Sequence, residues 1–158
     1  MRIAIGADPY GFPLKEAVKA HLLANKYQVE DFGIDHLEET TPYYTLAEQV
    51  AQQIIAGEFQ RGILFCGTGM GMAIVANKHP GIYAAVCESS FTAEKSRTIN
   101  NSNILTLGSM VVTEAIAKDI VDTWLQSEFT QGWEAEIQEW LLHSMQDIST
   151  IEKILFKE

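Results

Sequence analysis

The sequence has 158 residues, of which 47% are hydrophobic and 20% are charged. This length suits one ordinary domain, and the composition excludes a disordered, collagen-like or low-complexity chain. The 11 Lys and Arg residues against 21 Asp and Glu residues give a formal net charge of −10. Nucleic acid is therefore excluded as a partner, because binding it needs clustered cations. No apolar run approaches the roughly 20 residues of a membrane-spanning helix, so we expect a cytoplasmic protein without a membrane segment.

Apolar runs alternate with amphipathic stretches along the whole chain. Short apolar runs predict strands, and apolar residues with a 3.6-residue period predict helices. The expected order is strand 2–7, helix 14–23, strand 25–32, helix 44–55, strand 62–66, a helix from 71, strand 82–87, helix 92–100, strand 103–107, helix 113–125 and a long helix 133–156 with a weak break near Ser149. This alternation favours one α/β domain over residues 1–158, a Rossmann-like five-stranded parallel sheet with helices on both faces.

The last predicted helix, residues 133–156, follows the final strand and is an addition to the alternating pattern. Apolar side chains share one side of it: Trp133, Ile137, Trp140, Leu141, Met145 and Ile148. A stripe of this kind must be buried against the body of the protein or against another subunit. We therefore expect a homodimer or homotetramer with this helix at a subunit interface.

A glycine-rich loop with the sequence Cys-Gly-Thr-Gly-Met-Gly-Met, residues 66–72, connects the third predicted strand to the next helix. Ligands of parallel α/β sheets bind beyond the carboxyl ends of the strands, where this loop lies. Three alternate glycines let backbone N–H groups turn inward together and form a concave site for an oxyanion. The loop lacks the Gly-Lys-Ser/Thr of nucleotide-binding P-loops and the spacing of the dinucleotide fingerprint.

The loop also carries a thiol and a hydroxyl. Cys66 ends the strand, and Thr68 follows two residues later. A thiolate beside a helix N-terminus can act as a nucleophile or general base, and an N–H nest stabilises an enediolate that forms next to it. The competing interpretation is a core cysteine above a tight turn, which is the interpretation we adopt for Cys87. The spacing of the Cys and His residues indicates no metal site.

Three segments, residues 62–78, 5–15 and 100–109, resemble the ribose-5-phosphate isomerase B and galactose-6-phosphate isomerase family. The resemblance extends over about residues 1–130 and is most specific in the cysteine–glycine loop. It implies a five-stranded Rossmann-like subunit and a dimer with its sites at the interface. It also implies an aldose–ketose isomerase for a sugar or sugar phosphate that needs no metal or organic cofactor.

The resemblance further implies roles for individual residues. Cys66 matches the general base that removes the proton next to the carbonyl, and Thr68 matches the hydroxyl that moves a proton between the two substrate oxygens. The other expected substrate contacts are Asp8 on the hydroxyls, Tyr43 near the ring oxygen, Asn100 from the neighbouring subunit, and the enediolate-binding backbone of Gly67, Gly69, Met70 and Gly71.

Several positions depart from the family pattern. Pro9 and Ile99 replace histidines, and the histidine that Ile99 replaces opens the sugar ring in the family. Apolar residues also replace three arginines that hold the phosphate: Met110, Trp133 and Ile137. Loss of these guanidinium groups removes the bidentate donors of a phosphate clamp. The cations nearby in sequence that are candidates to replace them are Lys78, Lys95 and Arg97.

Three interpretations follow from these departures. The substrate is a different sugar, such as an unphosphorylated or short-chain one that never closes into a ring. Alternatively, the chain resembles the B-type subunit of galactose-6-phosphate isomerase and needs a partner chain for its phosphate site. The third interpretation is a non-catalytic sugar-binding paralogue. The retained cysteine, hydroxyl and glycine loop favour an isomerase.

Overall fold

The computed structural model of the protein describes residues 1–156 and contains one parallel sheet. Its strands are β1 (Arg2–Ala7), β2 (Gln28–Asp31), β3 (Arg61–Cys66), β4 (Ala84–Val86) and β5 (Ile104–Gly108), in the order β2-β1-β3-β5-β4. All four strand pairs are parallel. The predicted five-stranded parallel α/β fold is therefore confirmed.

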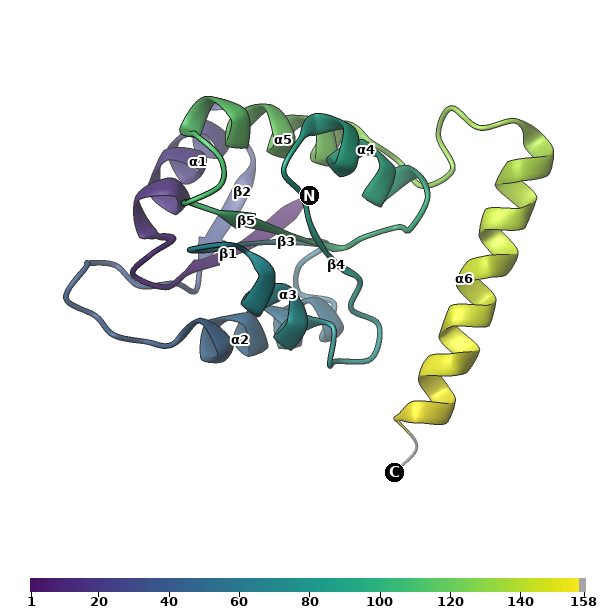
Figure 1. Ribbon diagram of the computed structural model, residues 1–158, viewed down its shortest axis with the longest axis horizontal. Coiled ribbons are helices and arrows are strands. Elements are labelled where there is room, and N and C mark those ends of the chain that lie inside the picture. The colour runs from purple at the N-terminus through teal and green to yellow at the C-terminus, as the bar shows by residue number, and fades with distance from the viewer. Residues whose placement is uncertain (157–158) are drawn as a thin grey trace.

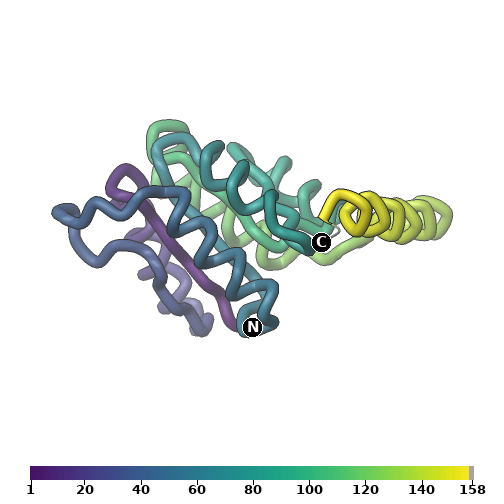
Figure 2. The backbone as a smooth tube through the Cα atoms, turned by 90° about the horizontal axis from the view of Figure 1, so that it is seen from below, coloured from purple at the N-terminus to yellow at the C-terminus, as the bar shows by residue number. Residues whose placement is uncertain are grey.

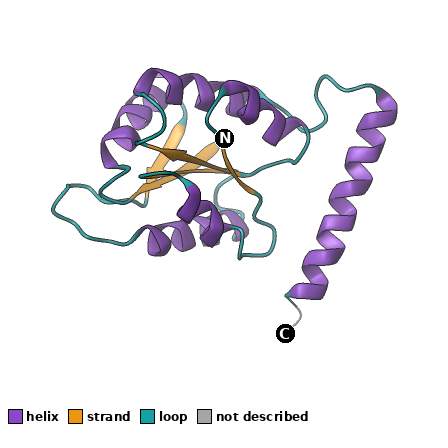
Figure 3. Ribbon diagram, viewed as in Figure 1, coloured by secondary structure: helices purple, strands orange, loops and turns teal. Residues whose placement is uncertain are grey.

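Helices cover both faces of the sheet, as Figures 1 and 3 show. One face carries α1 (Phe12–Ala24), α4 (Ser90–Thr98) and α5 (Glu114–Gln126), and the other carries α2 (Tyr43–Ile55) and α3 (Met70–Ala76). Each face has its own apolar cluster, centred on Trp124 on the α5 side and on Met72 on the α3 side. Burial on both faces explains why β3 after Arg61 and β5 apart from Thr106 are apolar and do not alternate with polar residues.

Several predicted boundaries differ from the structure by one to three residues, and one predicted helix break is absent. The strand expected from residue 25 begins only at Gln28, because Lys26 has a φ of 64° and belongs to a turn. The strand expected from residue 82 begins at Ala84. Just before it, the Tyr83 N–H donates to a side-chain oxygen, Asn103 Oδ1, and not to the backbone of a neighbouring strand. The break expected near Ser149 does not exist, because Thr150 donates to the Gln146 carbonyl and the helix continues.

The last helix, α6 (Ala135–Leu155), projects beside the sheet layers and does not pack flat on them (Figures 1 and 2). Leu141 is buried, and near the far end the Gly81 N–H donates to the Glu152 carboxylate at 2.8 Å. Trp140 is nevertheless 63% exposed, and Ile137, Leu142, Ile148, Ile151 and Ile154 are exposed as well. The position of α6 at a subunit interface remains a prediction. Among residues 1–156, no helix combines the length and apolar character needed to cross a membrane.

Candidate active site

The carboxyl ends of β1 and β3 border a cavity of about 360 Å³. This cavity, called the Cys66 cavity below, brings together most of the residues that the sequence analysis selected. Its lining consists of Asp8, Tyr10, Tyr43, Cys66, Gly67, Thr68, Gly71 and Met110. Tyr10 was missed by the sequence analysis, although its place just after the first strand is a signal for it.

The Cys66 thiol is held in a defined position at the end of β3. Cys66 is 6% exposed, and its Sγ accepts the Gly69 N–H at 3.0 Å. The backbone around it is fixed by β5, since the N–H groups of Ser109 and Met110 donate to the carbonyls of Cys66 and Gly67 at 2.9 Å. Cys66 therefore lines the cavity with its sulfur held in place by one N–H donor.

The loop can take this shape only with glycine at particular positions. Gly69 has a φ of 80°, in the left-handed region, and immediately precedes α3. A Cβ at Gly108 would lie 2.6 Å from the carbonyl carbon of Thr68, so the loop rests directly on the end of β5. Within the loop, the Met70 N–H points to Thr68 Oγ1 at 3.4 Å. The Met70 side chain is exposed, and neither Gly69 nor Met70 is in the lining of the Cys66 cavity, so the predicted role of their backbone stays a prediction.

Asp8 supplies a carboxyl group on the β1 side of the cavity. It is buried, and one of its oxygens accepts the Gly11 N–H at 2.9 Å. Burial raises the pKa of Asp8, and hydrogen bonds from the N–H groups of Gly11 and Tyr10 oppose this rise in part. The carboxylate is therefore poorly solvated before a substrate arrives and suits contact with substrate hydroxyls.

We expect Asp8→Asn to stabilise the protein at pH 7 while lowering its activity. An acid with a raised folded-state pKa destabilises the native state above that pKa and has no such effect below its unfolded value of about 3.9. The gain in Tm over the wild type should therefore be present at neutral pH and disappear as the pH falls below about 4. Thermal unfolding of both proteins across this range measures it, and a Tm difference that does not vary with pH would contradict the role of burial.

Tyr43 contributes an aromatic ring to the cavity lining. It is the first residue of α2, and its ring lies on the loop glycine Gly71, where a Cβ would approach Tyr43 Cε2 to 2.7 Å. Gly71 therefore has no room for a side chain unless the ring moves. This close approach connects the start of α2 to the start of α3.

Two separate cavities hold four of the five positions that depart from the family pattern, and Pro9 lines neither of them. Met110 lies in the Cys66 cavity, where its terminal methyl is 3.3 Å from the Cβ position of Gly67. A second cavity of about 410 Å³, called the apolar groove below, is lined by Ile99, Trp133, Ile137, Trp140 and Leu141. Neither lining includes a lysine or arginine.

Arg97, proposed above as a replacement for the phosphate clamp, is excluded from that role. It is 2% exposed, and its guanidinium donates to the Ser102 carbonyl at 2.6 Å and to Asn101 Oδ1 at 2.9 Å. Burial, together with the nearby Arg61, lowers the pKa of Arg97 to about 10. Arg97 therefore stabilises the connection from α4 to β5.

The two candidate lysines are on the surface of the subunit. The Lys95 ammonium pairs with Glu94 at 2.8 Å and lies 5.3 Å from the centre of the Trp133 ring, at the edge of the apolar groove. Lys78 is exposed just beyond α3. Neither belongs to the lining of the Cys66 cavity.

Asn100 is not brought to the Cys66 cavity within one subunit. It is exposed and lines a third cavity with Asn77, Tyr83, Ser96 and Ser102. Cys87 is 1% exposed in the apolar cluster beneath α4, and burial raises its pKa, so it is the core residue that the sequence predicted. Within residues 1–156, no cluster of three or more His, Cys, Asp or Glu side chains is arranged to hold a metal ion.

Comparison with known proteins places these features in context. The family model described as Ribose/Galactose Isomerase matches residues 3–139. The chain is 44% identical over 158 residues to 4-deoxy-4-sulfo-D-erythrose isomerase of Clostridium sp. (strain MSTE9), covering 100% of this chain and 99% of that protein. It is 41% identical over 135 residues to D-erythrulose-4-phosphate isomerase of Pectobacterium atrosepticum, covering 85% and 89%. The structure of ribose-5-phosphate isomerase B from Clostridium thermocellum is similar with a TM-score of 0.89 and 42% identity, covering 98% of this chain and 99% of that one.

Proposed function

The chain belongs to the ribose/galactose isomerase family, and we propose that within it the chain interconverts a short open-chain aldose and its ketose, both with an anionic group at the far end. That the protein is an aldose–ketose isomerase follows from the family and from relatives that are named as isomerases. The substrate and the roles of individual residues are our proposal. The observation that carries it is the Cys66 cavity, which retains a thiol, a hydroxyl and a carboxyl group although the ring-opening position is Ile99.

In the proposed reaction, Cys66 acts as the base. Its thiolate takes the proton from C2 of the aldose and returns it to C1, while Thr68 moves a proton from the C2 oxygen to the C1 oxygen. The intermediate enediolate is held by backbone N–H groups of residues 67–71 other than those of Gly69 and Met70, which already point to Cys66 Sγ and Thr68 Oγ1, and Asp8 binds the remaining hydroxyls. Each role suits its group, because the reaction needs one base, one proton carrier and an oxyanion site.

A four-carbon substrate explains why a ring-opening group is dispensable. The sugars in the names of two relatives carry a sulfonate or a phosphate at C4. Only the hydroxyls at C2 and C3 then remain to attack a C1 aldehyde, and they would close strained rings of three or four atoms. Such a sugar stays open, so Ile99 in place of a histidine costs the reaction nothing.

The lack of lysine and arginine in the apolar groove favours a sulfonate over a phosphate at the far end of the substrate. A phosphate monoester carries a charge of about −1.5 to −2 at pH 7, whereas a sulfonate carries a single negative charge. The apolar groove has no guanidinium group, but the Trp133 indole nitrogen is buried without a hydrogen-bond partner in residues 1–156. We propose that Trp133 covers the substrate and that its N–H is a donor for the anionic end.

The site requires a second subunit in this proposal. Asn100 and the apolar groove lie outside the Cys66 cavity of their own chain, and the exposed apolar face of α6 offers a surface for association. We therefore propose a homodimer or a homotetramer built from such dimers. The cytoplasmic location inferred from the sequence also stays a prediction.

The test is a panel of substrates assayed with the purified chain. We expect kcat/KM of about 10⁴ M⁻¹s⁻¹ or more for 4-deoxy-4-sulfoerythrose and much lower values for ribose 5-phosphate and for erythrose without an anionic group. Erythrose 4-phosphate separates the effect of chain length from that of charge.

Three outcomes would contradict the proposal. A value in the same range for ribose 5-phosphate would mean that ring opening and phosphate binding are intact. Activity only after addition of another chain would identify a B-type subunit. Absence of solvent exchange at the C1 and C2 protons for every sugar would identify a binding protein.

A further inference from the structure

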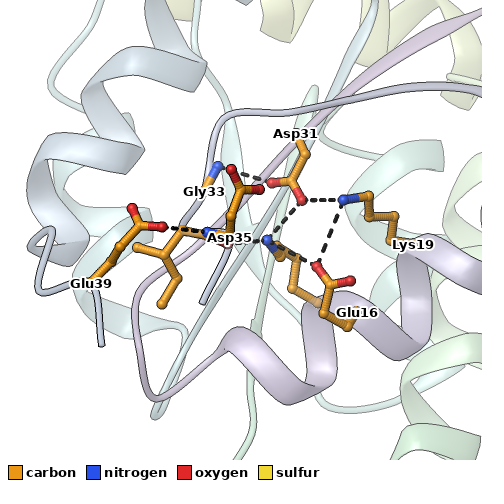
Figure 4. A network of polar contacts seen from close by, with 8 residues as sticks. Glu16, Lys19, Asp31, Gly33, Asp35 and Glu39 are labelled. Atoms are coloured by element: carbon orange, nitrogen blue, oxygen red, sulfur yellow. Dashed lines mark hydrogen bonds and ion pairs between the residues drawn. The ribbon is translucent and has the colours of Figure 1, made fainter. Parts of the chain in front are cut away.

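A lysine ammonium is buried next to the active site but outside the Cys66 cavity. Lys15, in the first turns of α1, is 0% exposed, although lysine is almost never fully buried unless it is paired. Its Nζ donates to the Ile34 carbonyl at 2.6 Å and contacts Asp31 Oδ2 at 2.7 Å and Glu16 Oε1 at 3.1 Å. Figure 4 shows the carboxylates of Asp31 and Glu16 converging at this point.

The segment that this ammonium holds, residues 31–34, lies against the end of β1. Asp31 Oδ1 accepts the Gly33 N–H at 2.9 Å, and the Ile34 N–H donates to the Ala7 carbonyl at 3.2 Å. A Cβ at Gly33 would lie 2.5 Å from the Ala7 nitrogen, so the two backbones touch. Ala7 directly precedes Asp8, the carboxyl group of the cavity.

The same segment leads to a second lining residue of the cavity, Tyr43. From Ile34 the chain runs through an exposed loop, residues 35–42, into Tyr43 at the start of α2. Lys15 itself belongs to the helix that follows Gly11, whose N–H binds Asp8. The ammonium therefore connects the element that orients Asp8 to the segment that delivers Tyr43.

We infer that Lys15 is a positioning residue, which sets the separation of Asp8 and Tyr43 by clamping the Ile34 carbonyl to α1. The inference rests on the proposed function, in that Asp8 and Tyr43 must both contact the substrate. A displacement of about 1 Å at an active site can lower activity about 100-fold. The contact between Lys15 and the Ile34 carbonyl can therefore affect activity although neither residue lines the cavity.

Lys19 provides a matched control on the same helix. Its Nζ also lies 2.7 Å from Asp31 Oδ2, but it is partly exposed and makes no hydrogen bond to Ile34. Burial would raise the pKa of Asp31, yet the hydrogen bonds from Lys15, Lys19 and the Gly33 N–H outweigh it and hold that pKa below its usual value. Replacing Lys15 also removes its ion pairs with Asp31 and Glu16, but Lys19 still pairs with both carboxylates. The contact that Lys19 does not replace is the one to the Ile34 carbonyl.

The experiment compares Lys15→Met and Lys19→Met in the full chain. For Lys15→Met we expect kcat/KM to fall about 10- to 100-fold, mostly through KM because the Cys66 loop is untouched, and hydrogen exchange in a peptide spanning residues 32–38 to accelerate. For Lys19→Met we expect kcat/KM within about twofold of the wild type, since Lys19 is partly exposed and only its ion pairs with Asp31 and Glu16 are lost. Lys15→Gln, which retains an N–H donor, should recover part of the loss.

Two results would overturn the inference. One is a folded Lys15→Met with wild-type KM or with a loss equal to that of Lys19→Met. The other is failure of both Lys15 variants to fold, which would make Lys15 a residue for stability alone. The proposed function is judged separately, on the substrate range of the wild type. Should the wild type prefer another aldose, the Lys15 variants are measured on that aldose.

Discussion

Replacement of Cys66 by alanine should lower kcat/KM for isomerisation by roughly 10²- to 10⁴-fold, the range for loss of a general base. Cys66 Sγ is the only thiol in the cavity lining, beside the hydroxyl of Thr68. The backbone hydrogen bonds that shape the loop, from Ser109 and Met110, do not involve the sulfur and should persist in the variant. Steady-state kinetics on the preferred sugar, with circular dichroism to verify the fold, measures the effect.

Cys87→Ala is the matched control for this substitution. Cys87 is also buried, but it lies in the apolar cluster beneath α4 and outside the Cys66 cavity. Its replacement should leave kcat/KM unchanged and cost about 1 kcal/mol of stability. Full activity of Cys66→Ala, or an equal loss of activity in both variants, would show that the thiol is not the base.

Features formed by neighbouring residues were predictable from the sequence. The three central strands of the sheet, β1, β3 and β5, are largely apolar runs, and their burial on both faces follows from that local pattern. The Cys66 loop was equally accessible, because residues 66–71 are consecutive and the thiol, the hydroxyl and the glycines stand together in the sequence. Asp8 and Tyr43 needed the family resemblance, since they come from other elements.

Features that depend on distant packing were not predictable. Arg97 lies on a polar helix and was a candidate to bind phosphate, yet residues 101, 102 and 127 accept its hydrogen bonds and bury it. Lys15 is similar, because its main partners, Asp31 and Ile34, follow 16 and 19 residues later in the chain. A sequence pattern predicts on which face of a helix a lysine or arginine lies. It does not predict which residues from other elements pack against that face.

The apolar groove was predictable in its residues but not in their arrangement. The sequence identified Ile99, Trp133 and Ile137 as three separate departures from the family pattern. In the fold they share one cavity with Trp140 and Leu141, so the end of α4 and the start of α6 form a single apolar wall. Polar groups of the family are replaced at three positions of this one wall. Such a grouped replacement indicates a changed substrate more strongly than scattered substitutions do, because one ligand can contact the whole wall.

The second prediction of large effect concerns the sharing of the site between subunits. Asn100 lines a cavity on its own chain that does not include Cys66, so in the proposed dimer it completes the site of the other subunit. Cys66→Ala and Asn100→Ala should each be impaired alone, the latter by about tenfold for loss of one or two hydrogen bonds. Mixed dimers should recover activity, because one of their two sites then has both native residues.

Refolding the two variants together in equal amounts gives mixed dimers as half of the molecules, so activity should reach about one quarter of the wild type in a closed two-fold dimer. The control mixture replaces Asn100→Ala with the double variant Cys66→Ala/Asn100→Ala, which offers no native Cys66 and should recover nothing. If Asn100 acted within its own subunit, the first mixture would show only the mean of its two components. A fully active monomer at micromolar concentration would exclude a shared site altogether.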